Sequence, residues 1–180
     1  MGCVNASEIE WFDRAGGEPV KLRRPDPGWC SAAAVWMDRI RLALGDCEAE
    51  IDHVGSTAVQ ELSAKPVLDL QVQVPDLHDE AAFRPPLESL DLVLRARSNE
   101  FCFFRPPAGR SREVHVHVCE IGSDWARDHL WFRDALRADD ALMREYEALK
   151  LRLARSVGED RSAYNRGKTE FIVRVVGSRP

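Results

Sequence analysis

One stretch constrains the fold of this 180-residue chain more than any other: residues 51–74, which read IDHVGSTAVQELSAKPVLDLQVQV. A strand pattern is followed by Gly55-Ser56, a short amphipathic segment and a second strand pattern. Glycine directly after a strand lets the backbone come close to a phosphate, and we expect Ser56 and Thr57 to cap the short helix behind it. The stretch therefore predicts strand, tight turn, short helix and strand, with an anion site at the turn.

The second strand of this unit has one polar and one apolar face. Side chains alternate along a strand, so Asp69, Gln71 and Gln73 share one face, and the other face carries Leu68, Leu70, Val72 and Val74. A carboxylate close to a phosphate-binding turn is how proteins hold a metal ion against a nucleotide. We therefore expect the active site on the polar face.

Strand and helix patterns flank this unit. Ser31 fits the N-cap of a helix that runs to Leu44 and stops at Gly45, with an apolar face made by Val35, Trp36, Ile40, Leu42 and Leu44. A helix over 77–90 is interrupted or kinked by Pro85-Pro86. Three strands are expected over 90–96, 100–105 and 112–120.

The last third of the sequence is helical. Asp124 is the expected cap of a helix through 138, Asp139 or Asp140 of one through 156, and Ser162 of one reaching toward 177. The stripe at helical spacing in the middle helix predicts core packing, and its members are Leu142, Tyr146, Leu149 and Leu153. The predicted fold class is α+β, a mixed sheet flanked by helices with a helical C-terminal subregion.

Composition limits the classes of partner. With 44% hydrophobic and 31% charged residues, the chain fits one domain over 19–180, after an N-terminal extension at 1–18. With 25 basic and 30 acidic residues the net charge is −5, so no nucleic acid or membrane partner is expected. The five cysteines form no C-x-x-C pair and the N-terminus has no long apolar run, so a cytoplasmic location is expected.

A later strand carries paired histidines. Alternation puts Glu113, His115, His117 and Cys119 on one face. If this strand pairs with the strand of Asp69, then Asp69, His115 and His117 could bind a divalent metal. The alternative is a polar cleft that donates hydrogen bonds to a phosphate without a metal. Spacing alone does not set the register between two strands, so we favour the alternative.

Three cations lie near these strands. Lys65, Arg105 and Lys168 are candidates for phosphate contacts, because Arg binds phosphate bidentately and Lys neutralises it as a point charge. For each of them alone, a solvated surface role is the more common one. Four charges of the middle C-terminal helix are interpreted as surface charges without chemistry: Glu145, Glu147, Lys150 and Arg152.

Two motifs resemble the signature of a known family. HVGSTAV at 53–59 and LSAKPVLDL at 62–70 are similar to the GrpB-like family of the nucleotidyltransferase-fold superfamily. The similarity continues in the same order at 103–105, 115–118, 122–125, 129–134, 146–150 and 164–171. It covers 25–176, nearly the whole chain.

The resemblance implies a mixed sheet flanked by helices and a Gly-Ser turn that grips nucleotide phosphates. In active relatives, two carboxylates two residues apart and a third on a later strand hold Mg²⁺ for attack on the α-phosphorus. Gly55 and Ser56 match the turn, and Asp69 matches the first carboxylate. Gln71 stands at the second position, and the third falls near His115 or His117. Gln60-Glu61 also departs from the family pattern, which affects the local shape of the turn.

Three hypotheses follow for function. The first is an enzyme that transfers a nucleotidyl group or activates a small acid or amine, using ATP or another nucleoside triphosphate and Mg²⁺. The second is a non-catalytic nucleotide- or cofactor-binding module with a degenerate metal site. The third is a transition-metal protein.

The residues have different roles in these hypotheses. In the first, Asp69, Gln71 and His117 are the catalytic set, and the phosphate ligands are Gly55, Ser56, Thr57, Lys65, Arg105 and Lys168. In the third, Asp69, His115 and His117 bind the metal. Gln71 favours the second hypothesis over the first, the histidine pair supports the third, and the turn favours the first two.

Overall fold

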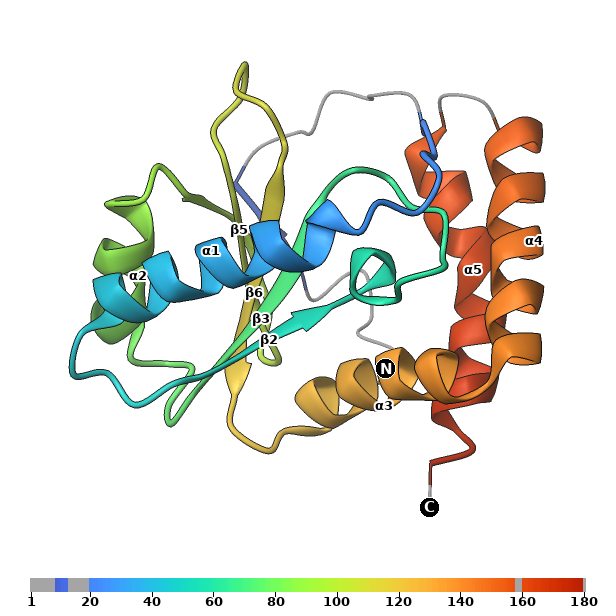
Figure 1. Cartoon of the computed structure of the whole chain (residues 1–180). Helices are drawn as coiled ribbons and strands as arrows, with labels where there is room; N and C mark the ends of the chain where they lie inside the picture. Colours follow the sequence, from blue (N-terminus) through green and yellow to red (C-terminus); the bar gives the residue numbers. More distant parts are fainter. Residues whose placement is uncertain (1–8, 13–19, 158–159, 180) are drawn as a thin grey trace.

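A single mixed sheet forms the centre of the molecule. The computed structural model describes residues 9–12, 20–157 and 160–179. Within them the sheet has the strand order β1-β4-β5-β6-β3-β2 (Figure 1). The strands are β1 (Glu10–Trp11), β2 (Glu50–Val54), β3 (Leu68–Val74), β4 (Val93–Arg97), β5 (Cys102–Arg105) and β6 (Val114–Glu120). Because β3 and β6 are parallel and the other neighbours antiparallel, the predicted mixed sheet is confirmed.

Helices flank the sheet, as the sequence predicted. They are α1 (Gly28–Leu44), α2 (Glu80–Glu88), α3 (Asp124–Ala138), α4 (Asp140–Ser156) and α5 (Arg161–Val176), with a short 3-10 helix η2 (Ser56–Ala58) after β2. In Figure 1, α1 crosses one face of the sheet, and α4 and α5 stand side by side at the right. None of the helices in the described ranges is long and apolar enough to cross a membrane.

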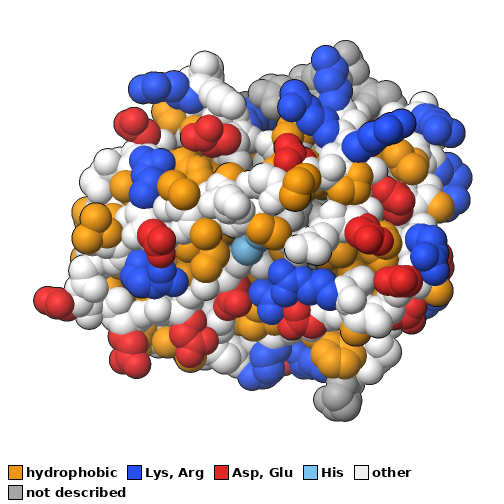
Figure 2. Space-filling view, viewed as in Figure 1, with side chains coloured by type: hydrophobic (Ala, Val, Ile, Leu, Met, Phe, Trp, Pro, Cys, Tyr) orange, Lys and Arg blue, Asp and Glu red, His pale blue; other side chains and the backbone are white. Residues whose placement is uncertain are grey.

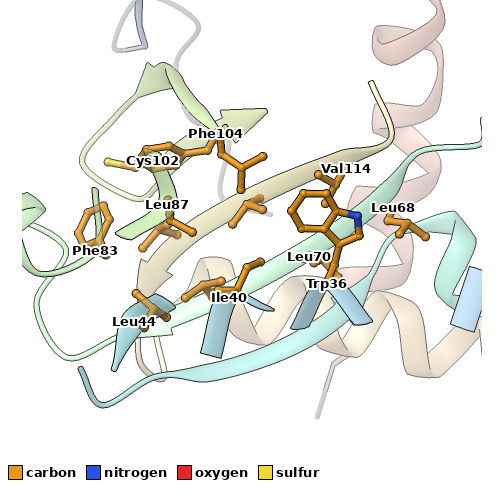
Figure 3. Packing of buried hydrophobic residues seen from close by; sticks show 14 of the residues in the cluster. Trp36, Ile40, Leu44, Leu68, Leu70, Phe83, Leu87, Cys102, Phe104 and Val114 are labelled. Carbon is orange, nitrogen blue, oxygen red and sulfur yellow. The ribbon is translucent and has the colours of Figure 1, made fainter. Parts of the chain in front are cut away.

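The apolar face of the sheet packs against α1 and α2. Trp36, Ile40 and Leu44 of α1 belong to the same buried cluster as Leu68 and Leu70 of β3. In Figure 3, Trp36 lies beside Leu70, and Leu44 lies toward Leu87 of α2. The predicted apolar face of this helix was partly wrong, because Val35 and Leu42 are exposed while Trp29 and Ala33 are buried. The helix starts at Gly28, before the predicted cap, and its buried positions follow the spacing of three or four residues set by the sheet.

The N-caps of two C-terminal helices differ from the prediction. Ser123, not Asp124, caps α3, because its extended backbone lets the hydroxyl accept from the Ala126 N–H at 3.2 Å. Asp160, not Ser162, caps α5 by accepting from the Ala163 N–H at 2.9 Å. Asp139 caps α4, one of the two residues predicted for that role.

The predictions for the proline-containing helix and for the domain boundary can also be compared with the structure. The helix predicted at 77–90 is α2, and it runs through Pro85-Pro86 near its C-terminal end. The predicted boundary at 18–19 lies outside the described residues, as does most of the extension. Glu10–Trp11, within that extension, pairs with β4, and Arg97 Nε donates to Glu10 Oε2 at 2.7 Å.

The polar face of the sheet is turned toward the C-terminal helices. A second apolar cluster joins the segment after η2 to these helices, and its buried members are Val59, Leu62, Leu136, Met143, Tyr146, Phe171 and Val175. This cluster fixes the Gly55-Ser56 turn against α4. The space between the polar sheet face and the helical subregion is where the polar candidates meet.

Candidate functional site

The register of β3 and β6 decides which polar side chains meet. Asp69 pairs with His115 and Gln71 with His117, and all four face away from α1. Phe103 of β5 pairs with His117 on the other side of β6. This parallel pairing, which the sequence left open, aligns the carboxylate and the histidines on one surface.

Asp69 and His115 form a hydrogen-bonded pair. The distance from His115 Nδ1 to Asp69 Oδ1 is 3.1 Å, and about a third of the Asp69 side chain is exposed (33%). Burial opposes ionisation of Asp69, but the hydrogen bond and charge of His115, with His117 and Lys65, hold its pKa well below the usual range. An ionised carboxylate only accepts, so His115 Nδ1 carries the proton of this hydrogen bond.

His117 does not join that pair. Its ring stacks on Phe103 with centroids 4.9 Å apart and contacts Trp125 at 5.4 Å. Burial lowers the pKa of His117 to about 3, so the ring is neutral. In the described part of the chain, no three His, Cys, Asp or Glu side chains are placed to hold a metal ion. The three side chains predicted for a transition metal are therefore not grouped as a metal site in the described residues, and the His117 ring packs against Phe103 and Trp125.

Gln71 is buried beneath α3 and does not line the cavity described below. Its side chain is 0% exposed, Nε2 donates to the Ala126 carbonyl at 3.4 Å, and Oε1 has no hydrogen-bond partner among the described residues. Magnesium prefers several hard oxygen ligands in octahedral geometry. Asp69 with a buried amide does not fit the carboxylate set that the resemblance implies.

The turn before η2 requires glycine. Gly55 has φ +70°, which L side chains rarely adopt, and a Cβ there would lie 2.6 Å from Asp69 Oδ2. The backbone of the turn therefore approaches the Asp69 carboxylate closely, whereas the predicted approach of this backbone to a phosphate stays a prediction. The close approach brings Asp69 directly against the turn.

The hydroxyl groups after Gly55 do not cap η2, contrary to the prediction. Gly55 is the N-cap and no side chain bonds there. Thr57 Oγ1 donates to the Val67 carbonyl at 3.3 Å and therefore accepts from His53 Nε2 at 2.9 Å. Ser56 Oγ instead accepts from Lys150 Nζ at 2.9 Å. The hydroxyls thus hold the turn to β3 and α4 rather than to its own helix.

Lys150 is a site residue that the sequence analysis missed. It is 2% exposed, so its assignment to the helix surface was wrong, and Nζ also donates to the Ser63 carbonyl at 2.5 Å. Burial, together with the charges of Lys168 and Lys65, lowers the pKa of Lys150 to about 7. Its position four residues after Tyr146, on the same helix face as a predicted core residue, was the available signal.

A cavity of about 900 Å³ collects most predicted site residues. Of those, its walls include Gly55, Ser56, Thr57, Lys65, Asp69, Arg105, His115, His117 and Lys168. Further basic side chains line it, namely Arg95, Arg112, Lys150, Arg161 and Arg166. Among the described residues, the carboxylates on the walls are Asp69 and Asp160. Three of the four lysines in the chain therefore face one cavity.

The lysines crowd one another at this wall. Burial lowers the pKa of Lys168 to about 7, and the charges of Lys65 and Arg161 act in the same direction. Lys168 Nζ lies 4.6 Å from the ring centroid of Tyr164, and Lys65 Nζ lies 5.4 Å from the same centroid. Figure 2 shows basic side chains along the upper right of the molecule, over α4 and α5. An anion at this wall would relieve the mutual repulsion.

Two arginines of α3 fix the turn from outside. Arg137 Nε and Nη2 both donate to the Ala58 carbonyl, at 3.0 and 2.9 Å. Arg133 Nη1 donates to the His53 carbonyl at 3.1 Å and to Asp52 Oδ1 at 3.2 Å. The turn is therefore pre-organised by α3 and α4 together.

Comparison with known sequences gives a consistent result. The family model described as GrpB protein matches residues 19–177. A UPF0157 protein of Pseudomonas aeruginosa is 39% identical over 173 residues, covering 92% of this chain and 70% of the relative. A UPF0157 protein of Halalkalibacterium halodurans is 31% identical, covering 87% and 80%. A dephospho-CoA kinase of Mycolicibacterium paratuberculosis is 30% identical over 81% of this chain and 42% of the kinase.

Solved structures show the same fold. The conserved protein GrpB from Enterococcus faecalis superposes with a TM-score of 0.76 at 23% identity, covering 87% of this chain and 95% of that chain. The RNA terminal uridylyl transferase Cid1 gives a TM-score of 0.52 at 13% identity, covering 72% and 41%. Terminal uridylyl transferase 4 from Trypanosoma brucei with bound dUTP gives 0.50 at 15% identity, covering 83% and 52%. The architecture is that of the nucleotidyltransferases.

Proposed function

Because this chain belongs to the GrpB family, we propose that it binds the phosphates of a nucleotide in the cationic cavity beside Gly55-Ser56. One observation carries the proposal: among the described residues, eight basic side chains and two carboxylates line one cavity, although the net charge of the chain is −5. A cavity with one sign of charge and low-dielectric walls attracts the opposite charge. ATP or another nucleoside triphosphate is the ligand class.

The phosphates have a defined place in this proposal. Gly55 keeps the turn open beside Asp69, and Lys150 holds the Ser56 hydroxyl. Lys65, Lys150 and Lys168 face the phosphates and neutralise them as point charges. Burial, followed by the charges of neighbouring cations, lowers the pKa values of Lys150 and Lys168, so a bound phosphate favours their protonated forms.

Similar proteins support a phosphate-bearing ligand. Cid1 and the trypanosomal transferase are named as uridylyl transferases, and the latter is described with bound dUTP. A further relative, matched over 42% of its own length, is named dephospho-CoA kinase. We therefore include a coenzyme with nucleotide character among the ligands to be tested.

Magnesium has a limited role in the proposal. Asp69 alone, with one oxygen bonded to His115, does not make a magnesium site. We propose that the lysines of the cavity neutralise most of the phosphate charge, and that Mg²⁺ enters only together with the nucleotide.

The Asp69–His115 pair favours a second candidate, nucleotidyl transfer to a small molecule. Asp69 fixes the His115 tautomer with the proton on Nδ1, which leaves Nε2 as an acceptor. In the proposed step, Nε2 takes the proton of the acceptor group as that group bonds to the α-phosphorus and pyrophosphate leaves with the electron pair of the broken bond. Asp69 then stabilises the imidazolium.

Calorimetric titration of the purified chain tests the binding proposal. ATP, UTP and dephospho-CoA are titrated with Mg²⁺ and with EDTA. We expect one of them to bind in both conditions, and Lys150→Met to weaken it about tenfold or more. The matched control is Arg41→Gln, an exposed charge on α1 across the sheet. No binding at about 1 mM ligand, or equal effects of both substitutions, would contradict the proposal.

A further inference from the structure

Six of the eight cations that line the cavity among the described residues form two groups, and Arg161 and Arg166 of α5 are the other two. The lysine group, Lys65, Lys150 and Lys168, lies near the turn and Tyr164. The arginine group, Arg95, Arg105 and Arg112, comes from β4, β5 and the segment just before β6. A nucleotide at the turn accounts for the first group and leaves the role of the second open.

Strand order separates the two groups. Across the sheet, β5, β6, β3 and β2 are neighbours in that order. The cavity face therefore presents Arg105, then the His115–Asp69 pair, then the Gly55 turn. Phe103 pairs with His117 in antiparallel register, and continuing that register by two residues places Arg105 beside His115. The pair lies between the arginine group and the turn.

An irregularity in β4 places the second arginine. Leu94 pairs with Phe104 and Ala96 with Phe103, so Arg95 is an extra residue between two consecutive pairs. Such a bulge re-aims a side chain, and Arg95 lines the cavity although it is only 7% exposed. Arg105 is 3% exposed at the same wall. Both guanidinium groups are therefore held in fixed positions by the sheet.

The charges of the arginine group act on one another. Burial lowers the pKa of Arg95, and the charge of Arg112 adds to this effect. The lysines act instead on one another and on Asp69. The three guanidinium groups line the same cavity, and guanidinium groups bind carboxylate and phosphate oxygens in a planar, bidentate geometry.

We propose that the arginine group binds a carboxylate or phosphate group of a second, acceptor substrate while the nucleotide occupies the lysine group. The inference rests on the proposed nucleotide binding at the turn. Planar guanidinium groups bind both kinds of anion bidentately, which fixes orientation as well as charge. An anion held there places the rest of the acceptor over the Asp69–His115 pair. The acceptor is therefore a small organic acid or phosphate ester.

Thermal-shift titration with saturating ATP tests the second subsite, with succinate and inorganic phosphate as probes. With the lysine group occupied by ATP, one of the probes should raise the thermal unfolding midpoint further, because a ligand that binds the folded state stabilises that state by mass action. Arg105→Gln should weaken binding of that probe about tenfold or more, and should leave ATP affinity within about threefold of that of the unaltered protein. Arg112→Gln, at a less buried position, repeats the test if the first variant fails to fold, and Arg41→Gln is the control.

The outcomes separate this inference from the proposed function. If ATP binds but no probe binds with it, the second subsite is refuted and the nucleotide site stands. If the arginine variants weaken ATP as much as Lys168→Met does, the arginines belong to the nucleotide site and the inference is overturned. If the unaltered protein binds no nucleotide, both proposals fall together.

Discussion

At the scale of single residues, Gly55 is the position where backbone conformation and site chemistry meet. Gly55→Ala would place a Cβ 2.6 Å from Asp69 Oδ2 at φ +70°. The backbone strain alone costs about 1–2 kcal/mol. We expect Gly55→Ala to lower the free energy of unfolding by more than this, because Asp69 must move. We also expect it to weaken nucleotide binding about tenfold.

Gly45→Ala is the control for that change. Gly45 has φ +59°, but no neighbouring atom lies within 4 Å of the place that a Cβ would take, so it carries the backbone penalty without the clash. Urea denaturation gives the stability of both variants, and calorimetry gives their nucleotide affinity. Equal losses of stability and affinity in both variants would show that Asp69 tolerates the methyl group at position 55. The turn would then not be adapted to Asp69.

The lysines predict how binding depends on pH. Lys150 and Lys168 have pKa values of about 7, so between pH 7 and 9 the free protein must take up protons to face a phosphate with charged lysines. We expect affinity to fall as pH rises through this window, by up to about tenfold per unit for each lysine. Titrations in buffers of different ionisation enthalpy measure the uptake directly.

The stability of the free protein changes in the opposite direction. A lysine with a lowered folded pKa binds fewer protons in the folded than in the unfolded state between about pH 7 and 10.5. The loss of folding stability from each such lysine is complete below pH 7 and declines as pH rises.

The lysine assignment can be tested with two variants. Lys168→Met should remove one proton from the uptake that accompanies nucleotide binding, whereas Lys21→Met, at an exposed position, should not. Proton uptake unchanged by Lys168→Met would contradict this assignment.

At the scale of elements, the N-cap of α3 is a position where the prediction from sequence and the structure differ. Ser123→Ala removes the hydroxyl that accepts from Ala126 N–H, and we expect a loss of about 1 kcal/mol of unfolding free energy. Asp124→Ala removes surface ion pairs with Arg127 and Arg179, and we expect at most about half of that loss. Chemical denaturation compares the two, and a larger loss for Asp124→Ala would restore the predicted cap.

The periodicity of the sequence predicted most helices and strands, but seldom which residues of an element are buried. The strands around the Gly-Ser turn and the three C-terminal helices were predicted because alternation and helical spacing are local properties of the chain. The exposure of Val35 and Leu42 was not, since the sheet selects which stripe of α1 is buried. The bulge at Arg95 was also missed, because a strand pattern holds no sign of one extra residue.

At the scale of the whole molecule, the site depends on distant elements. Asp69 and the turn follow from one continuous stretch, which is why they were predicted together. Gln71 was predicted as a metal ligand but lies under α3, because the packing of a later helix decides which polar strand residues stay open. Lys150 was missed since only the fold brings α4 to Ser56.

The charge distribution of the molecule gives a prediction that needs no knowledge of the acceptor. Among the described residues, eight basic side chains line one cavity although the chain as a whole is acidic, so we expect the attraction of a nucleotide to be local and electrostatic. Salt shortens the screening length from about 10 Å at 0.1 M to about 3 Å at 1 M. We therefore expect nucleotide affinity to fall about tenfold or more between about 0.05 and 0.5 M NaCl, while the thermal midpoint of the free protein changes little. Calorimetry at several salt concentrations measures the first quantity and a melting curve the second. Affinity independent of salt would mean that base contacts and apolar packing dominate binding, and the phosphates would then lie away from the lysine group.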